Sequence, residues 1–136
     1  MREPLVTPGC PRVLIVDDER AIVSALVNVL RRAGFDPIPA FGASEADALL
    51  SEAVSAMVLD LRMQHMRGDV FFYIASARFP VLRRRTLFIT GDITPEAERL
   101  IGATGCGCLW KPFPNSVLVD AIRALLPDYS VPTVVG

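Results

Sequence analysis

Two hydrophobic patterns alternate along this chain: short continuous apolar runs, and longer segments whose apolar residues recur at helical spacing. Continuous runs are typical of strands buried on both faces of a parallel sheet, and they occur at residues 12–18, 56–60, 86–90 and 106–110. A further short run at residues 35–40 contains Pro37 and Pro39, which suit only an edge strand. The pattern therefore predicts five strands.

Helical spacing predicts five helices between and after these strands, at residues 19–33, 44–53, 69–77, 95 to 102 or 105, and 114–126. The fourth helix has the clearest start, with Thr94 as the capping residue, Pro95 at the first position and Glu96 near the positive end of the helix. The predicted buried stripes of the second and fifth helices are Ala46, Leu49, Leu50 and Ala53, and Val117, Leu118, Ala121, Ile122 and Leu125.

Alternating strands and helices predict an α/β fold, in which a doubly wound parallel sheet carries helices on both faces. A length of 136 residues suits a single domain. We place this domain at residues 12–126, after a flexible lead-in at 1–11 and before a tail at 127–136. The chain has neither a glycine-rich dinucleotide loop nor the lysine motif of P-loop proteins, which disfavours both kinds of nucleotide binding.

Composition narrows the location and the partners of the protein. The hydrophobic share is 51%, the mean hydropathy is +0.40 and the net charge is -1, so we expect a folded core and no direct nucleic-acid binding. No uncharged stretch approaches the length of about 18 residues that a membrane helix needs, and no signal-peptide pattern is present. We therefore expect a cytoplasmic protein without membrane insertion. Three cysteines and a single histidine disfavour a zinc site and a disulfide framework.

Polar residues stand at the ends of four predicted strands. Asp17 and Asp18 end the first, Asp60 ends the third, Thr90 ends the fourth, and Lys111 follows the fifth. Because the carboxyl ends of parallel strands meet at one edge of a sheet, we expect these five side chains to converge. Lys111 is the only lysine beside thirteen arginines, and its compact ammonium group suits phosphate oxygens. Taken by itself, Asp60 could equally begin a turn or cap a helix.

Three crowded carboxylates repel one another unless a cation neutralises them. Mg²⁺ fits best, because it binds through one or two carboxylates together with phosphate oxygens and water, and Asp17, Asp18 and Asp60 are its candidate ligands. Asp60 would also be the nucleophile that forms an acyl phosphate. Lys111 would neutralise charge on the transferring phosphoryl group, and Thr90 would donate a hydrogen bond to it. The alternative is an acidic, calcium-like patch or a coincidence of helix caps.

Together these residues resemble the receiver domain of bacterial two-component response regulators, over residues 12–126. The segments that match are 13–19, Leu59-Asp60, 63–68, Thr90-Gly91 and Lys111-Pro112-Phe113. The resemblance implies a flavodoxin-like sheet ordered 2-1-3-4-5 with five helices. It also implies that Asp60 accepts a phosphoryl group from the phosphohistidine of a sensor histidine kinase or a phosphotransfer protein. Slow self-catalysed hydrolysis then removes that group, so the domain is not a conventional enzyme.

The resemblance further implies that Asp18, Asp60 and the backbone carbonyl of Arg62 bind Mg²⁺, while Asp17 acts mainly through water. The Lys111–Pro112 peptide bond is expected to be cis. Gln64 departs from the family pattern, which usually has a proline at this position, and the change is expected to loosen the loop. His65 beside it is expected to be an exposed loop residue.

Cys108 is the second departure, because the family commonly carries Tyr or Phe three residues before the lysine. In the usual scheme the threonine moves toward the phosphoryl group and this ring rotates inward, which reshapes the face formed by the fourth helix, the fifth strand and the fifth helix. Cysteine has no ring to rotate. We predict that phosphorylation still occurs, while its structural readout is muted or uses another residue such as Trp110.

Three functional classes follow from these residues. The favoured one is a phospho-acceptor signalling domain, in a two-component system or phosphorelay, that switches contacts with a downstream protein; a homodimer through the face described above is compatible with it. The alternative is a receiver-like interaction module whose partner binds regardless of phosphorylation. A metal-dependent phosphatase is disfavoured, because Arg62 stands where it would need a second acid. Only ten residues follow Leu126, so we expect either a stand-alone regulator or one receiver of a longer protein such as a hybrid kinase.

Overall fold

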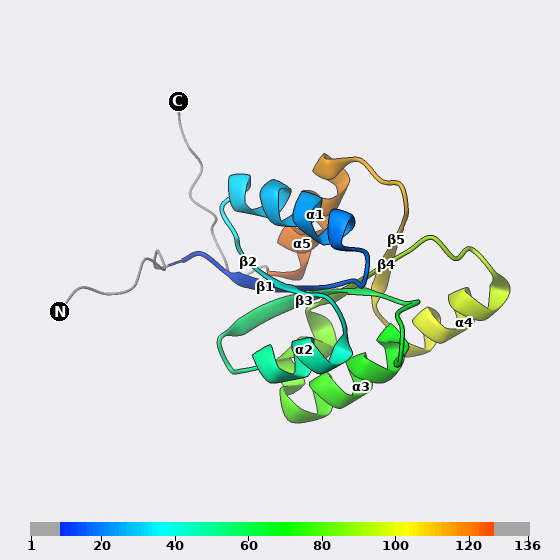
Figure 1. The fold of residues 1–136 in the computed structure, drawn as a ribbon. Coiled ribbons are helices and arrows are strands. Elements are labelled where there is room, and N and C mark those ends of the chain that lie inside the picture. The colour runs from blue at the N-terminus through cyan, green and yellow to red at the C-terminus, as the bar shows by residue number, and fades with distance from the viewer. Residues whose placement is uncertain (1–8, 127–136) are drawn as a thin grey trace.

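The computed structural model describes residues 9–126, so the predicted tail and the lead-in before Gly9 lie outside the described residues. Strands and helices alternate in the predicted order (Figure 1). The elements are β1 (Arg12–Val16), α1 (Arg20–Arg32), β2 (Asp36–Ala40), α2 (Ala43–Leu49), β3 (Val54–Asp60), α3 (Gly68–Arg78), the short 3-10 helix η1 (Pro80–Arg84), β4 (Thr86–Thr90), α4 (Pro95–Thr104), β5 (Gly107–Trp110) and α5 (Asn115–Leu125).

The five strands form one parallel sheet in the order β2-β1-β3-β4-β5. This order confirms the predicted fold and puts β2, with its two prolines, at an edge as expected. Helices α1 and α5 cover one face of the sheet, and α2, α3 and α4 cover the other (Figure 1). Because every strand runs in the same direction, the carboxyl ends of all five lie at one edge.

Each face of the sheet has its own hydrophobic core, because successive side chains of a strand point to opposite faces. On β1, Leu14 and Val16 belong to the core beneath α2 and α3, whereas Val13 and Ile15 belong to the core beneath α1 and α5. All four side chains are fully buried. Burial of one such side chain contributes roughly 1.5–3 kcal/mol, so the central strands, and the polar residues at their ends, are held firmly in place.

Helices α2 and α5 differ in part from the prediction. α2 ends at Leu49, short of the predicted end at Ala53, because Leu50 already has an extended backbone. Leu49 and Ala53 were both predicted to be buried, and both predictions are wrong, since the two residues are exposed. On α5, Leu118 is fully buried as predicted, but Val117 is 41% exposed. Within residues 9–126, no helix has the length and apolar character that crossing a membrane requires.

The start and end of α4 follow the predicted signals. The side-chain oxygen of Thr94 accepts a hydrogen bond from the backbone N–H of Ala97, at 3.2 Å, and Pro95 occupies the first position. Gly105 ends the helix in the left-handed conformation, with φ of 78°, which a residue with a side chain rarely adopts. These local signals set the two ends of α4, and the short loop before it follows the carboxyl end of β4 at Thr90.

Candidate functional site

Four strands bring polar side chains to the carboxyl edge of the sheet. Asp17 directly follows β1, Asp60 ends β3, and Thr90 ends β4. All three residues are buried, and Asp60 is only 4% exposed. Lys111 follows β5, and its backbone N–H donates to the carbonyl of Thr90 at 2.8 Å. The Lys111–Pro112 bond is cis, as expected.

The ammonium group of Lys111 is the centre of this cluster. Its Nζ lies 2.8 Å from Oδ2 of Asp17 and 3.5 Å from Oδ2 of Asp60. It also lies 3.5 Å from Oε1 of Glu19, an exposed residue at the start of α1. The only lysine of the chain therefore neutralises carboxylates from two different strands. Burial by itself lowers the pKa of Lys111, but its hydrogen bond to Asp17 and the charge of Asp60 outweigh burial and raise that pKa.

The surroundings of Asp60 change the pKa of its carboxyl group strongly. Burial is the main cause and the Asp17 carboxylate the second, and together they raise the pKa of Asp60 from 3.8 to about 7. The Lys111 charge and a hydrogen bond from the Arg62 backbone act in the opposite direction without cancelling the rise. A carboxyl group with this pKa is poised between its neutral and its ionised form near neutral pH. Such perturbation in a charged cluster is typical of functional sites.

Carboxylate oxygens of Asp17, Glu19 and Asp60 all lie within 4.8 Å of one another. Hard oxygen donors at this spacing fit a small divalent cation such as Mg²⁺, and in this structure the Lys111 ammonium is the cation that contacts all three residues. Glu19 was not among the predicted ligands, although it extends the acidic run of Asp17 and Asp18 by one residue and that run could have suggested it. Asp18, which was also predicted as a ligand, lies outside this group of three, and its Oδ2 accepts a hydrogen bond from the backbone N–H of Gln64 at 3.0 Å.

Thr90 is fully buried at the end of β4, and its Oγ1 accepts a hydrogen bond from the backbone N–H of Asp92 at 3.0 Å. This bond uses an oxygen lone pair and leaves the hydroxyl hydrogen able to donate. The Thr90 hydroxyl could therefore donate a hydrogen bond to an anionic group that forms at this same edge of the sheet. Thr90 lies at the carboxyl edge of the sheet, where the sequence predicted it.

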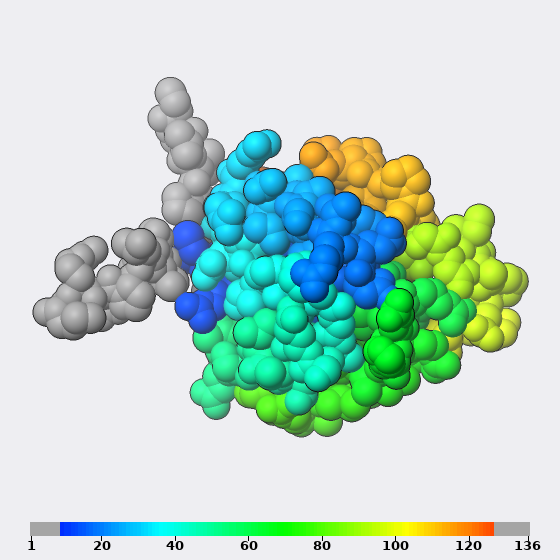
Figure 2. Space-filling model, in the orientation of Figure 1, coloured from blue at the N-terminus to red at the C-terminus, as the bar shows by residue number. Residues whose placement is uncertain are grey.

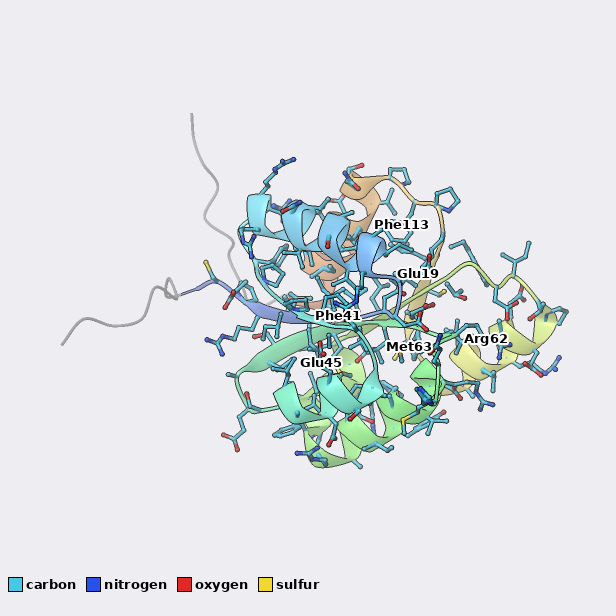
Figure 3. The ribbon with its side chains drawn as sticks, in the orientation of Figure 1. Glu19, Phe41, Glu45, Arg62, Met63 and Phe113 are labelled. Atoms are coloured by element: carbon cyan, nitrogen blue, oxygen red, sulfur yellow. The ribbon has the colours of Figure 1, made fainter. Side chains whose placement is uncertain are left out.

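The side chain of Arg62 joins the loop after β3 to the start of α4. Its Nε lies 2.7 Å from Oδ2 of Asp92, and its Nη2 lies 2.7 Å from Oε1 of Glu96. Hydrogen bonds from Thr94 are the main cause that lowers the pKa of Asp92 to about 2, and Arg62 adds to them. Figure 3 shows Arg62 reaching toward α4, with Glu19 and Met63 nearby at the same edge. The sequence analysis predicted a role only for the backbone carbonyl of Arg62. No pattern in the sequence predicted that the Arg62 side chain would pair with Asp92 and Glu96.

The loop between β3 and α3 is shaped by a close backbone approach. Gly68 at the start of α3 faces the backbone of Asp60, and its N–H donates to the carbonyl of Leu61 at 2.8 Å. His65 has φ of 72° and is exposed, as expected for a loop residue. It lines a largely apolar cavity of about 660 Å³ on the α2 side of the loop, and Asp18 is another of the lining residues.

Cys108 is a half-buried side chain on β5, where it packs against the core beneath α2 and α3 and pairs in register with Phe88 of β4. Burial raises the pKa of its thiol to about 11, so it stays neutral and behaves as a small apolar group. Trp110, two residues along the same strand, is 38% exposed. Strand β5 therefore has an exposed indole at Trp110, next to Lys111 in the chain, and no aromatic ring at position 108.

Known proteins of one family match most of this chain. The profile of the response regulator receiver domain family matches residues 13–123. The putative response regulator NtrX-like protein of Rickettsia bellii is 34% identical over 115 residues, which cover 82% of this chain and 24% of that protein. The transcriptional regulatory protein CpxR of Escherichia coli is 31% identical over 119 residues, covering 85% of this chain and 49% of that protein.

Solved structures agree with these relatives. The chemotaxis protein CheY4 of Vibrio cholerae superposes with a TM-score of 0.78 at 27% identity, over 86% of this chain and 99% of that chain. A CheY-like receiver domain from Methanospirillum hungatei has a TM-score of 0.79 at 24% identity, over 88% of this chain and 95% of that chain, and shows the shared fold. The chain thus spans about a quarter of the NtrX-like relative and about half of CpxR, but nearly all of the two solved domains.

Proposed function

The chain belongs to the receiver domain family of two-component response regulators, and on that premise we propose that it accepts a phosphoryl group on Asp60. The donor is the phosphohistidine of a sensor histidine kinase or of a phosphotransfer protein. One observation carries the proposal: the only lysine of the chain lies 3.5 Å from the Asp60 carboxylate and 2.8 Å from Asp17. A buried acid beside a fixed ammonium group is the arrangement that phosphoryl transfer to a carboxylate needs.

In the proposed reaction an oxygen of the ionised Asp60 carboxylate forms a bond to phosphorus. The phosphorus–nitrogen bond of the donor breaks, and the leaving imidazole takes up a proton. Lys111 stabilises the charge on the phosphoryl oxygens, because its ammonium is already held at this edge by Asp17. Thr90 donates its hydroxyl hydrogen to one of the same oxygens. Water that later attacks phosphorus releases phosphate and restores the carboxylate.

A divalent cation fits the acidic group beside Asp60, and Mg²⁺ is the cation we propose. When bound, it would neutralise the carboxylates and the phosphoryl oxygens that approach them. The family resemblance favours Asp18, Asp60 and the Arg62 carbonyl as ligands, with Asp17 acting through water. The side chains supply a second candidate set, in which Glu19 contributes the third carboxylate. In either set Asp60 is both a ligand and the acceptor.

Acetyl phosphate in the presence of Mg²⁺ tests the proposed acceptor. The wild-type chain should gain the mass of one phosphoryl group, and Asp60→Asn should lose at least about 99% of this labelling, because an amide is a far poorer nucleophile than a carboxylate. The measurement is intact-protein mass spectrometry. Asp69→Asn is the matched control, since Asp69 on α3 is also 4% exposed but pairs with Arg67; it should label like the wild type. Equal labelling of Asp60→Asn would remove Asp60 as the acceptor.

We also expect a muted conformational readout. Beryllofluoride, which mimics the phosphoryl group, should shift the backbone resonances near Asp60 and Thr90 but leave most of residues 94–126 unchanged, because Cys108 has no ring to rotate and Arg62 holds α4 to the β3 loop. Heteronuclear NMR spectra with and without beryllofluoride measure this. Cys108→Tyr is the companion variant and should extend the shifts across β5 and α5. Broad shifts in the wild-type chain would show that the switch does not depend on an aromatic residue at position 108.

A further inference from the structure

The backbone amide of Gln64 holds the carboxylate of Asp18. Its N–H donates to Oδ2 of Asp18 at 3.0 Å, across a separation of 46 residues in the chain. The contact joins the loop after β3 to the turn between β1 and α1, and Figure 2 shows these two segments side by side at the surface, in bright green and blue. Asp18 is one of the acids at the carboxyl edge, so this bond bears directly on the site.

Asp18 lies apart from the other acids at this edge. The carboxylates of Asp17, Glu19 and Asp60 lie within 4.8 Å of one another, and Asp18 is not part of that group. A carboxylate oxygen that accepts an amide hydrogen has one lone pair occupied and its direction restricted. Asp18 must therefore give up the Gln64 amide, or share it, before the same oxygen can bind a cation.

The loop itself keeps the amide in this position. The carbonyl of Gln64 accepts a hydrogen bond from the N–H of Met66 at 2.8 Å, and the N–H of Gly68 donates to Leu61 at 2.8 Å. Between them His65 has a left-handed backbone, with φ of 72°, which is uncommon for a residue with a side chain. The donor is a main-chain group, so every residue type except proline supplies it at this position.

We propose that the Gln64 backbone amide is a positioning group that competes with Mg²⁺ for Asp18 and so lowers the affinity of the site for the cation. The inference rests on the proposed metal-dependent function. It adds a group outside the acidic cluster that sets the affinity for Mg²⁺. The side chain of Gln64 plays no part in it, because only the main-chain N–H makes the contact. Cation binding would release the amide and with it the tie between the two loops.

The test uses the full chain and MgCl2 followed by isothermal titration calorimetry. Gln64→Pro removes the amide hydrogen, and Gln64→Ala keeps it while removing the side chain. We expect the proline variant to bind Mg²⁺ roughly threefold to tenfold more tightly, which is the range that loss of one competing hydrogen bond produces. The alanine variant should stay within about twofold of the wild type. Equal affinities of all three proteins would overturn the proposal.

A second measurement does not depend on whether proline fits the loop. In the wild-type chain, NMR should show the Gln64 amide shifting upfield and exchanging faster with solvent as Mg²⁺ is added, because it loses its carboxylate acceptor. A Gln64 amide unchanged at saturating Mg²⁺ would overturn the proposal while leaving metal binding intact. Failure of the wild type to bind Mg²⁺ at all would overturn this inference and the metal requirement together, and acetyl phosphate labelling would still report separately on Asp60 as the acceptor.

Discussion

Replacing Gly68 by alanine should destabilise the domain by about 3 kcal/mol or more. The added methyl group would overlap the carbonyl oxygen of Asp60, and it would lie 2.9 Å from the carbonyl carbon of Asp60 and 3.2 Å from the Cα of Leu61. All three atoms belong to the backbone, so no side-chain rotation can relieve the overlap. Either α3 or the end of β3 has to move, and both elements are packed into the same core.

Urea denaturation followed by circular dichroism measures this loss. Gly102→Ala is the matched control, because a methyl group at Gly102 in α4 meets nothing within 4 Å. Alanine should stabilise a helix interior by about 0.5–1 kcal/mol relative to glycine, so the two substitutions should have opposite signs. The Gly68→Ala protein should also label more slowly with acetyl phosphate, since the displaced backbone carries Asp60. A Gly68→Ala protein as stable as the wild type would show that the backbones separate at little cost.

Asp60→Asn should stabilise the metal-free protein at pH 8 by about 2–4 kcal/mol. The pKa of Asp60 is raised from 3.8 to about 7 in the folded protein, mainly by burial and then by Asp17. Between those two pH values the folded chain binds more protons than the unfolded chain. The contribution of Asp60 to stability is therefore complete below about pH 4 and is lost as the pH rises through about 7. The Asp60→Asn protein carries an amide that does not ionise, so it does not lose stability as the pH rises.

The pH dependence of the stability difference separates this ionisation effect from a stabilisation that is the same at every pH. The advantage of Asp60→Asn over the wild type should be small at pH 4 and reach its full size at pH 8, measured as the free energy of unfolding in metal-free buffer. Saturating Mg²⁺ should reverse it, because a ligand that binds the folded wild type stabilises that protein selectively. Asp92→Asn is the control of opposite sign, since hydrogen bonds from Thr94 lower the pKa of Asp92 to about 2. An Asp60→Asn protein less stable than the wild type at pH 8 would show that the Lys111 ion pair outweighs burial.

Much of the architecture was determined by the sequence itself. Continuous apolar runs mark buried strands, and the prolines at 37 and 39 restrict β2 to an edge. Thr94, Pro95 and Gly105 set the ends of α4 through hydrogen bonds and backbone angles within a few residues. Because a parallel sheet aligns its strand ends, the same reading predicted that Asp17, Asp60 and Lys111 would meet. Each of these features depends on neighbours close along the chain or on the sheet pattern as a whole.

Other features were decided only by the tertiary structure. Leu49 has the right spacing for burial, yet this segment buries Ala46 and Leu50 and leaves Leu49 exposed. Glu19 joins the acidic group and Asp18 turns to the Gln64 amide, although both follow the same strand end. Arg62 selects Asp92 and Glu96, which lie 30 and 34 residues away along the chain. The direction of a side chain at a loop depends on which distant groups packing brings within reach, and those partners leave no periodic pattern along the chain.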